Sequence, residues 1–255
     1  MDLNLKDHRV IVTAGAGGIG LAIAKTFQAE GARVWVCDVD RTALDNLPDG
    51  INGAVFDVSD RGAVDGFMET AISDLGGLDC LVNNAGIAGP TGRVEEADPE
   101  GWDACINICL TGQFNCTRRA VAHLRRSNNP SIANLSSLAG RLGFPLRTAY
   151  AAAKWGVIGL TKSLSRELGA DGVRVNAILP GLVSGDRQTR VLSAKAAAEG
   201  VSYEEMEARA FSFTSVKTYV TPEEIAGQIL FLASPHGRHI SGQAISVCGD
   251  TQMLT

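Results

Sequence analysis

The stretch Arg9-Val-Ile-Val-Thr-Ala-Gly-Ala-Gly-Gly-Ile-Gly20 places a run rich in β-branched residues directly before a glycine-rich turn. A helical pattern from Leu21 to Glu30 follows, so the predicted order is strand, turn, helix. In this setting Gly15, Gly17 and Gly20 fit the G-x-G-x-x-G pattern. Its glycines allow a tight turn and let backbone N–H groups approach a pyrophosphate. The alternative interpretation is a tight turn without a ligand.

The next predicted strand, Arg33-Val-Trp-Val-Cys37, ends at Asp38. An acid about twenty residues after the glycines accepts hydrogen bonds from the adenosine ribose of NAD. The same charge repels the 2′-phosphate of NADP, and neither Ala16 nor Gly17 supplies a compensating cation. Arg41 is the one residue that would, but at the start of the next segment it is expected to be solvated. We therefore expect NAD as the cofactor, with NADP as the less favoured alternative.

Predicted strands and helices alternate along the rest of the chain. Further strands are expected at Gly53–Phe56, Leu78–Val82, Ile132–Leu135, Val173–Leu179 and Ala244–Val247, and helices at Gly62–Leu75 and after Thr221. This alternation predicts an α/β fold, a Rossmann-like doubly wound parallel β-sheet with helices on both faces, in a single domain spanning residues 1–255. Ligands bind at the carboxyl ends of such strands. Four polar residues fall at predicted strand ends, namely Asp38, Asp57, Asn83 and Ser137.

Tyr150 and Lys154 stand four residues apart in a helical pattern, so their side chains share one helix face. An ammonium beside a phenol favours the phenolate and lowers the phenol's pKa, which permits proton exchange with a bound alcohol or ketone near neutral pH. Ser137, on the loop after the Ile132–Leu135 run, would hold the substrate oxygen beside that phenol. Taken alone, such a pair is more often a packed tyrosine and a solvated lysine.

Several motifs together resemble the short-chain dehydrogenase/reductase family along essentially the whole chain. They are Thr13-x4-Gly18-x-Gly20, Asp57-Val58, Asn83-Asn-Ala-Gly86, Ser137 with Tyr150-x-x-x-Lys154, and Asn176-x-x-x-Pro180-Gly181. The resemblance implies that Ser137 polarises the substrate oxygen, that Tyr150 is the acid/base, and that Lys154 assists it and holds the nicotinamide ribose. It implies cofactor contacts from Gly15, Gly17, Gly18, Ile19, Gly20, Asp38, Asp57, Val58, Asn84, Ala85, Gly86, Tyr150, Lys154, Pro180, Gly181 and Val183.

Four positions depart from the family's pattern. Ala14 stands where the family usually has glycine, Ala153 replaces a frequent serine, and Cys248 stands where aspartate is common. The fourth, Cys109, aligns with the family's active-site asparagine just before Leu-Thr-Gly. Asn107 cannot replace that asparagine, because two helical residues rotate by about 200°. We therefore hypothesise that the proton relay of the active site is weakened, although Ser137, Tyr150 and Lys154 are intact.

Arginines cluster around the expected substrate side of the site. The segment 183–216 corresponds to the family's variable substrate lid, and its length suits a movable cover. Arg141 and Arg147 flank the loop between the serine and the tyrosine, while Arg187 and Arg190 lie early in the lid. If two of them face inward, we expect an anionic substrate such as a hydroxy acid or a sulfonate or phosphate ester. Solvated surface arginines are the alternative.

Composition excludes several classes of protein. The chain has 255 residues, 45% of them hydrophobic, and a formal net charge of −5, without the basic surface of a nucleic-acid-binding protein. No apolar run reaches the roughly 18 residues of a membrane span, and the N-terminus lacks a signal peptide's apolar region. We expect a cytoplasmic protein without nucleic-acid or membrane partners. The six cysteines are expected to be reduced, and Cys105, Cys109 and Cys116, on one helical stripe, are not expected to bind a metal.

The predicted function is the NAD-dependent interconversion of a secondary alcohol, such as a polyol or hydroxy acid, and its ketone. One alternative is an NADP-linked ketone or oxoacyl-thioester reductase. The other is a nucleotide-binding paralogue with little catalysis, suggested by Ala14, Cys109 and Cys248. The resemblance also implies a homo-oligomer, a tetramer or a dimer, formed through the helices carrying Cys105–Cys116 and Tyr150–Leu168.

Overall fold

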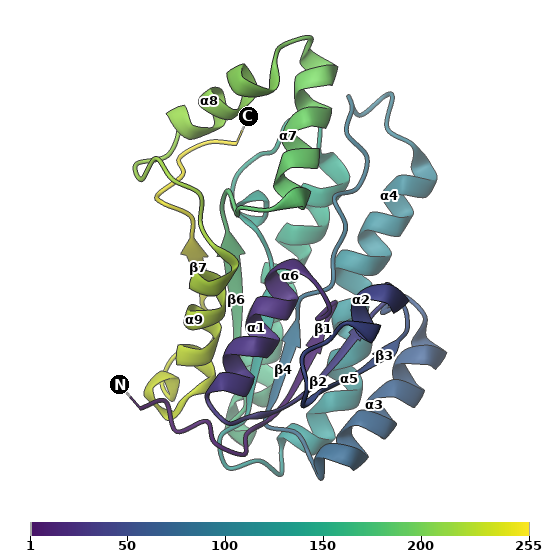
Figure 1. Ribbon diagram of the computed structural model, residues 1–255, viewed down its shortest axis with the longest axis vertical. Helices are drawn as coiled ribbons and strands as arrows, with labels where there is room; N and C mark the ends of the chain where they lie inside the picture. Colours follow the sequence, from purple (N-terminus) through teal and green to yellow (C-terminus); the bar gives the residue numbers. More distant parts are fainter. Residues whose placement is uncertain (1, 255) are drawn as a thin grey trace.

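The computed structural model, described here for residues 2–254, contains one sheet of seven parallel strands (Figure 1). The strands are β1 (Arg9–Thr13), β2 (Arg33–Asp38), β3 (Ile51–Val55), β4 (Cys80–Asn83), β5 (Ser131–Leu135), β6 (Arg174–Pro180) and β7 (Ala244–Val247). Their order is β3-β2-β1-β4-β5-β6-β7, so the chain starts in the middle and winds outward in both directions. The expected doubly wound α/β fold is confirmed.

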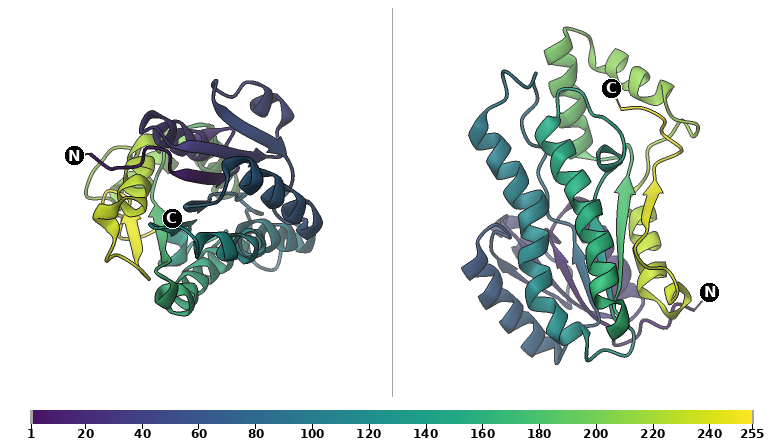
Figure 2. Two further views of the ribbon diagram at one scale, coloured as in Figure 1. Left: turned by 90° about the horizontal axis from the view of Figure 1, so that it is seen from below. Right: turned by 180° about the vertical axis from the view of Figure 1, so that it is seen from behind.

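Helices cover both faces of this sheet. On one face lie α1 (Gly18–Ala29) and α9 (Pro222–Ala233), and on the other α3 (Arg61–Leu75), α5 (Gly112–Leu124) and α6 (Thr148–Leu168), as Figure 2 shows from behind. The short α2 (Arg41–Asp45) joins β2 to β3, and α4 (Pro99–Ile106) continues through a π-helical turn, η1 (Asn107–Thr111), into α5. The chain also forms three 3₁₀ turns, η2 (Leu138–Gly140), η3 (Gly169–Asp171) and η4 (Pro235–Gly237).

Two further helices lie beyond the carboxyl ends of the strands. They are α7 (Asp186–Glu199) and α8 (Tyr203–Ser212), which stand at the top of Figure 1. They pack on each other through Leu192, Ala196, Met206 and Ala210. This helix pair is the part of the fold that stands above the edge where ligands bind in parallel sheets.

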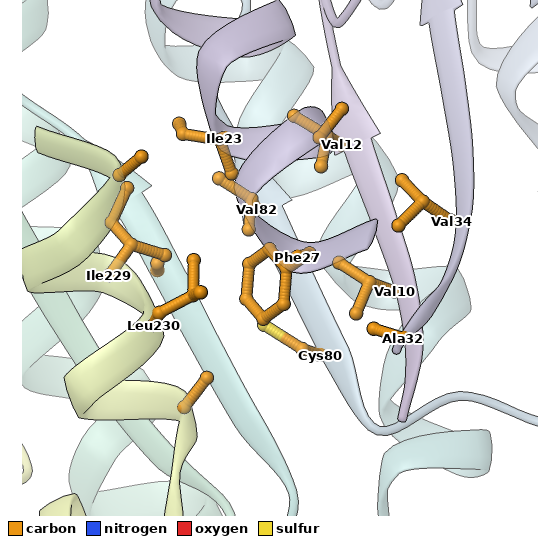
Figure 3. Close-up of a cluster of buried hydrophobic side chains, with 14 of the residues drawn as sticks. Val10, Val12, Ile23, Phe27, Ala32, Val34, Cys80, Val82, Ile229 and Leu230 are labelled. Carbon is orange, nitrogen blue, oxygen red and sulfur yellow. The ribbon is translucent and has the colours of Figure 1, made fainter. Parts of the chain in front are cut away.

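The core is divided by the sheet into two apolar layers. In the layer of Figure 3, Phe27 of α1 lies between Leu230 of α9 and the strand residues Val10 and Cys80. The central strands β1, β4, β5 and β6 are buried along almost their whole length, as expected for parallel strands covered by helices on both faces. Burial of a side chain such as Phe27 contributes about 1.5–3 kcal/mol.

Strand boundaries and the cysteine stripe differ from the sequence-based expectation. The third strand begins at Ile51 rather than Gly53, because Ile51 pairs in register with Val34 of β2. The predicted stripe of three cysteines is wrong. Cys105 and Cys109 pack in one cluster, whereas Cys116 packs in another beyond η1, since a π turn rotates the residues that follow it relative to a regular helix.

Helix α9 begins directly after Thr221, where the sequence predicts a helix. Thr221 Oγ1 accepts a hydrogen bond from Glu224 N–H, and the Glu224 carboxylate accepts one from Thr221 N–H, so the two residues form a capping box. Among residues 2–254, no helix is both long enough and apolar enough to cross a membrane.

Candidate active site

The glycine-rich turn after β1 has the tight geometry that its sequence predicts. Ala14 has φ of 49°, in the left-handed region where glycine is favoured. A Cβ added to Gly15 would lie 2.6 Å from Val36 Cβ, and one added to Gly20 would collide with Ala14 O. By contrast, no atom lies within 4 Å of a Cβ built at Gly17. The turn is therefore packed against the sheet on one side and open on the other.

This open side suits a dinucleotide. Gly17 is the N-cap of α1 and makes no side-chain cap, and the first turn holds no acidic residue, so N–H groups at the positive end of the helix dipole can bind phosphate. At the end of β2, Asp38 Oδ2 accepts from Ala16 N–H at 3.2 Å, and Oδ1 accepts from Val39 N–H at 2.8 Å. The carboxylate is thereby held against the turn, and these residues fit a dinucleotide cofactor.

Asn84 ties the turn to the next strand. Its Nδ2 donates to Thr13 O and Ala14 O, each at 3.0 Å, and the backbone N–H groups of Asn84 and Ala85 donate to Thr13 Oγ1. The Asn84 amide therefore supports the glycine turn directly. Two residues later, a Cβ built at Gly86 would lie 3.5 Å from Lys154 Nζ. The turn and the lysine are thus connected through one short segment.

The remaining predicted cofactor residues lie on the same edge. Asp57 Oδ1 accepts from Ser59 N–H at 2.8 Å, and the buried Val58 accepts from Asn115 Nδ2 through its carbonyl. Pro180 ends β6, a Cβ on Gly181 would lie 2.8 Å from Cys248 Cα, and Val183 pairs with Val220. Ile19, in the first turn of α1, is half-buried.

The predicted catalytic residues come from the end of β5 and the start of α6. Lys154 is 3% exposed, and its Nζ donates to Leu135 O at 2.7 Å and lies 5.5 Å from the centre of the Tyr150 ring. Ser137 Oγ accepts from Ala139 N–H at 3.1 Å, which fixes the start of η2. Ser136 Oγ donates to Lys154 O at 2.7 Å and joins the serine loop to α6.

Two arginines add to the positive charge around Tyr150. The guanidinium carbon of Arg147 lies 5.3 Å and that of Arg187 5.9 Å from the centre of the Tyr150 ring. Arg187 Nη1 also donates to Gly86 O at 2.9 Å. Arg141 is not part of this group, because its guanidinium donates to Ala244 O and Ser246 Oγ on β7, and Arg190 is exposed.

Cys109 lies inside the site, whereas Asn107 is exposed. The buried Cys109 thiol donates to Ile87 O at 3.4 Å and accepts from Ile87 N–H at 3.3 Å. A hydrogen bond from Cys105, the Lys154 ammonium and the Ile87 N–H lower the pKa of Cys109, against the effect of its burial. The same hydrogen bond and burial raise the pKa of Cys105. The thiol therefore occupies a positively charged, hydrogen-bonded position.

Sequence reasoning missed Lys195 of α7. Its side chain is 1% exposed and its Nζ lies 4.5 Å from the centre of the Phe144 ring. Burial lowers its pKa to about 8, with Glu199 opposing this shift and Arg147 and Arg209 adding to it. A signal did exist, because Lys195 falls three residues after Leu192 on the apolar face of its helix.

The chain is similar to known proteins along nearly its whole length. A family model described as enoyl-(acyl carrier protein) reductase matches residues 14–249. The chain is 36% identical over 254 residues to the 3-oxoacyl-(acyl-carrier-protein) reductase FabG of Thermotoga maritima, covering 97% of this chain and 98% of that one.

Two solved structures share the fold closely. A variant of actinorhodin polyketide ketoreductase with NADPH is 31% identical, with a TM-score of 0.90 and coverage of 95% of this chain and 97% of that one. NAD⁺-bound xylitol dehydrogenase is 26% identical, with a TM-score of 0.91 and coverage of 96% and 99%. The two relatives thus carry different nicotinamide cofactors on the same backbone.

Proposed function

Because the chain belongs to the short-chain dehydrogenase/reductase family, we propose that it interconverts a secondary alcohol and its ketone by hydride transfer with NAD. Members of this family are oxidoreductases that bind a nicotinamide dinucleotide. The observation that carries the proposal is the position of Lys154, buried one helical turn from Tyr150 at the edge that holds the glycine turn. A buried ammonium there has few structural uses other than acting on its neighbour.

In this proposal the protein's own groups handle the proton. The substrate oxygen lies between the hydroxyls of Ser137 and Tyr150, where Ser137 donates a hydrogen bond and Tyr150 takes or returns the proton. Positive charge from Lys154, Arg147 and Arg187 favours negative charge on the Tyr150 oxygen during transfer. The nicotinamide cofactor, when bound, accepts or supplies the hydride.

Asp38 supports NAD over NADP. Its carboxylate accepts hydrogen bonds from the Ala16 and Val39 N–H groups, which hold it beside the glycine turn, where we expect the adenosine ribose of a bound dinucleotide. A 2′-phosphate would face that negative charge. Arg41, the candidate to offset it, is exposed on α2 and lies 4.0 Å from Asp45.

An NADP-linked oxoacyl or ketone reductase is the second candidate. Similarity to a 3-oxoacyl-(acyl-carrier-protein) reductase and to a polyketide ketoreductase favours it. Asp38 argues against it. The third candidate, a nucleotide-binding protein with little catalysis, is suggested by Ala14, Cys109 and Cys248. Turnover by the wild-type protein removes it.

The deciding experiment follows NADH formation, with NADP in parallel, on pooled polyols, hydroxy acids and cyclic secondary alcohols. Reduction of pooled ketones and an oxoacyl thioester covers the reverse direction. Tyr150→Phe is the matched control, because it removes one hydroxyl from the site. Turnover with NAD that the variant lacks supports the proposal. Preference for NADPH and an oxoacyl thioester supports the second candidate, and NADH binding without turnover in either direction supports the third.

We also propose a homo-oligomer and a movable cover. Phe114 of α5 and Trp155 of α6 are 46% and 52% exposed on neighbouring helices, a feature typical of a surface that pairs with another copy. The cover is the segment 183–216, which carries α7 and α8 above the site. Light scattering tests the assembly, with Trp155→Glu expected to shift the mass toward the monomer.

A further inference from the structure

Two buried cations contact one aromatic ring beside the proposed catalytic tyrosine. Arg147 is 2% exposed and Lys195 is 1% exposed. The Arg147 guanidinium carbon lies 5.3 Å and Lys195 Nζ 4.5 Å from the centre of the Phe144 ring. Arg147 lies equally close, 5.3 Å, to the ring of Tyr150. The two charges and the reacting hydroxyl therefore belong to one region, although Lys195 comes from α7 and Arg147 from the loop before α6.

These cations are not neutralised by the surrounding protein. Arg147 Nη2 donates to Ala88 O at 2.5 Å, but among residues 2–254 the Arg147 Nε and Nη1 and the Lys195 Nζ have no hydrogen-bond partner. Neither side chain forms an ion pair with a carboxylate of the described chain. A buried charge without a partner costs several kcal/mol, so the fold gains nothing from keeping two of them together.

There is little room for water beside Lys195. The cavity beside Lys195 has a volume of about 30 Å³, room for about one water molecule. Apart from Lys195, Gln188 and Thr251, its lining side chains are apolar: Phe144, Leu182, Val191, Leu192, Ala210, Met253 and Leu254. A ligand of several atoms therefore reaches Lys195 only when α7 moves away from Phe144.

We infer that Arg147 and Lys195 bind an anionic group of the substrate, a carboxylate, sulfonate or phosphate, while Tyr150 acts on a hydroxyl or carbonyl of the same molecule. This inference rests on the proposed function. Arg147 Nε and Nη1 make no hydrogen bond to the described protein, so each remains able to donate to an oxygen of a ligand. Since Arg147 lies between the rings of Phe144 and Tyr150, the charge and the reacting carbon are a few bonds apart.

Binding is tested first without turnover. The NADH-saturated protein is titrated with propionate, ethanesulfonate or ethyl phosphate at constant ionic strength, with propionamide as the neutral probe, and the melting temperature is recorded. We expect the anion that matches the substrate to raise the melting temperature of the wild type and propionamide to leave it unchanged. Lys195→Met should weaken anion affinity at least tenfold, and Arg190→Gln, an exposed cation of the same helix, should not.

The same variant separates a ligand-binding role from a structural one. Removing an unpaired buried cation while keeping the stem should raise the melting temperature of the ligand-free Lys195→Met protein. A lower melting temperature with unchanged anion affinity would show that Lys195 stabilises the fold instead, and would overturn the inference. So would equal stabilisation by propionamide and the three anions.

The pH dependence provides a second readout. Lys195 faces Glu199 on its own helix, Arg147 on the loop and Arg209 on α8, and its pKa is about 8. Anion affinity should therefore fall as the pH rises through 8 and Lys195 loses its proton. Lys195→Arg should keep its affinity above that pH, because a guanidinium stays charged. An affinity in the wild type that is flat from pH 7 to 10 contradicts the inference.

Turnover then connects the site to catalysis. Hydroxycarboxylates and their methyl esters are compared as substrates, and the acid should have at least a tenfold lower KM than the ester. Lys195→Met should remove that difference by raising KM with little change in kcat. Anion binding in a protein that turns nothing over would refute the proposed function and leave the inference of an anion site intact. Turnover of acid and ester with equal KM would overturn the inference of an anion site and leave the proposed function intact.

Discussion

The Cys109 sulfur lies 3.3 Å from Ile87 N and 3.4 Å from Ile87 O, so one thiol both accepts from and donates to the same backbone residue. This contact joins the π turn η1 to the segment after β4 that contains Gly86. The Cys109 sulfur therefore connects two elements of the site at a position where the family has an amide.

Replacing Cys109 with asparagine should raise turnover. An amide has stronger donor and acceptor groups than a thiol and can make both bonds to Ile87. We expect this to strengthen the proton relay and to increase kcat by roughly threefold to tenfold. Cys109→Ala, which makes neither bond, should be slower than wild type. Steady-state rates with melting temperatures for all three proteins provide the check. An unchanged or lower rate in Cys109→Asn removes the hypothesis of a weakened relay.

Asp38 should set the cofactor preference. Asp38→Ala removes a charged acceptor for the ribose, and kcat/KM for NAD should fall about tenfold to a hundredfold. Adding Val39→Arg, at a neighbour that is 67% exposed, should then favour NADP by supplying a cation for its phosphate. Asp40→Ala is the matched control, since Asp40 caps α2 by accepting from Ala43 N–H. A wild type that prefers NADP would contradict this assignment.

Ala14→Gly should stabilise the protein. Its φ of 49° is strained for any residue with a Cβ, and relief of that strain should raise the free energy of unfolding by about 0.5–1 kcal/mol after the greater chain entropy of glycine is subtracted. Urea unfolding measures the change, with an unchanged m-value. The contrasting variant is Gly15→Ala, whose Cβ would meet Val36 and should cost about 1–3 kcal/mol. Equal effects at the two sites would mean that the turn relaxes freely.

Asp79 should govern acid stability at the amino ends of β1 and β4. Burial raises its pKa, but hydrogen bonds from the Arg9 side chain, Ser127 and the Arg9 backbone outweigh burial and bring the pKa from 3.8 down to about 2. The lowered pKa contributes about 2 kcal/mol that is present above pH 4 and lost as the pH falls to 2.

Asp79→Asn should therefore unfold more easily than wild type at pH 7, and the difference should shrink toward pH 2. Denaturant titrations at several pH values follow both proteins. Asp103→Asn, at an exposed position of α4, should match wild type throughout. A gap between Asp79→Asn and wild type that stays constant from pH 7 to 2 would show that the loss comes from packing rather than from ionisation.

Local sequence signals were sufficient to predict the sheet and its cofactor edge. The run from Arg9 to Gly20 predicted β1, its turn and α1 because apolar β-branched residues and glycines act over short distances. Strand β7 was predicted with the bounds it has, whereas β3 begins two residues earlier than predicted because its pairing with β2 decides where it begins. The spacing of Tyr150 and Lys154 placed both on one helix face for the same local reason.

The order of elements, the glycine turn and the Tyr150–Lys154 pair can thus be predicted from the sequence, since each depends on neighbours within about one or two helical turns. Which arginines face the site depends instead on tertiary packing. Arg147 is buried against two rings, while Arg141, six residues earlier, bonds to β7. Tertiary packing also places Lys195 against Phe144, which lies some fifty residues earlier in the chain. Burial and charge at such positions are set by packing between distant segments, which no local pattern encodes.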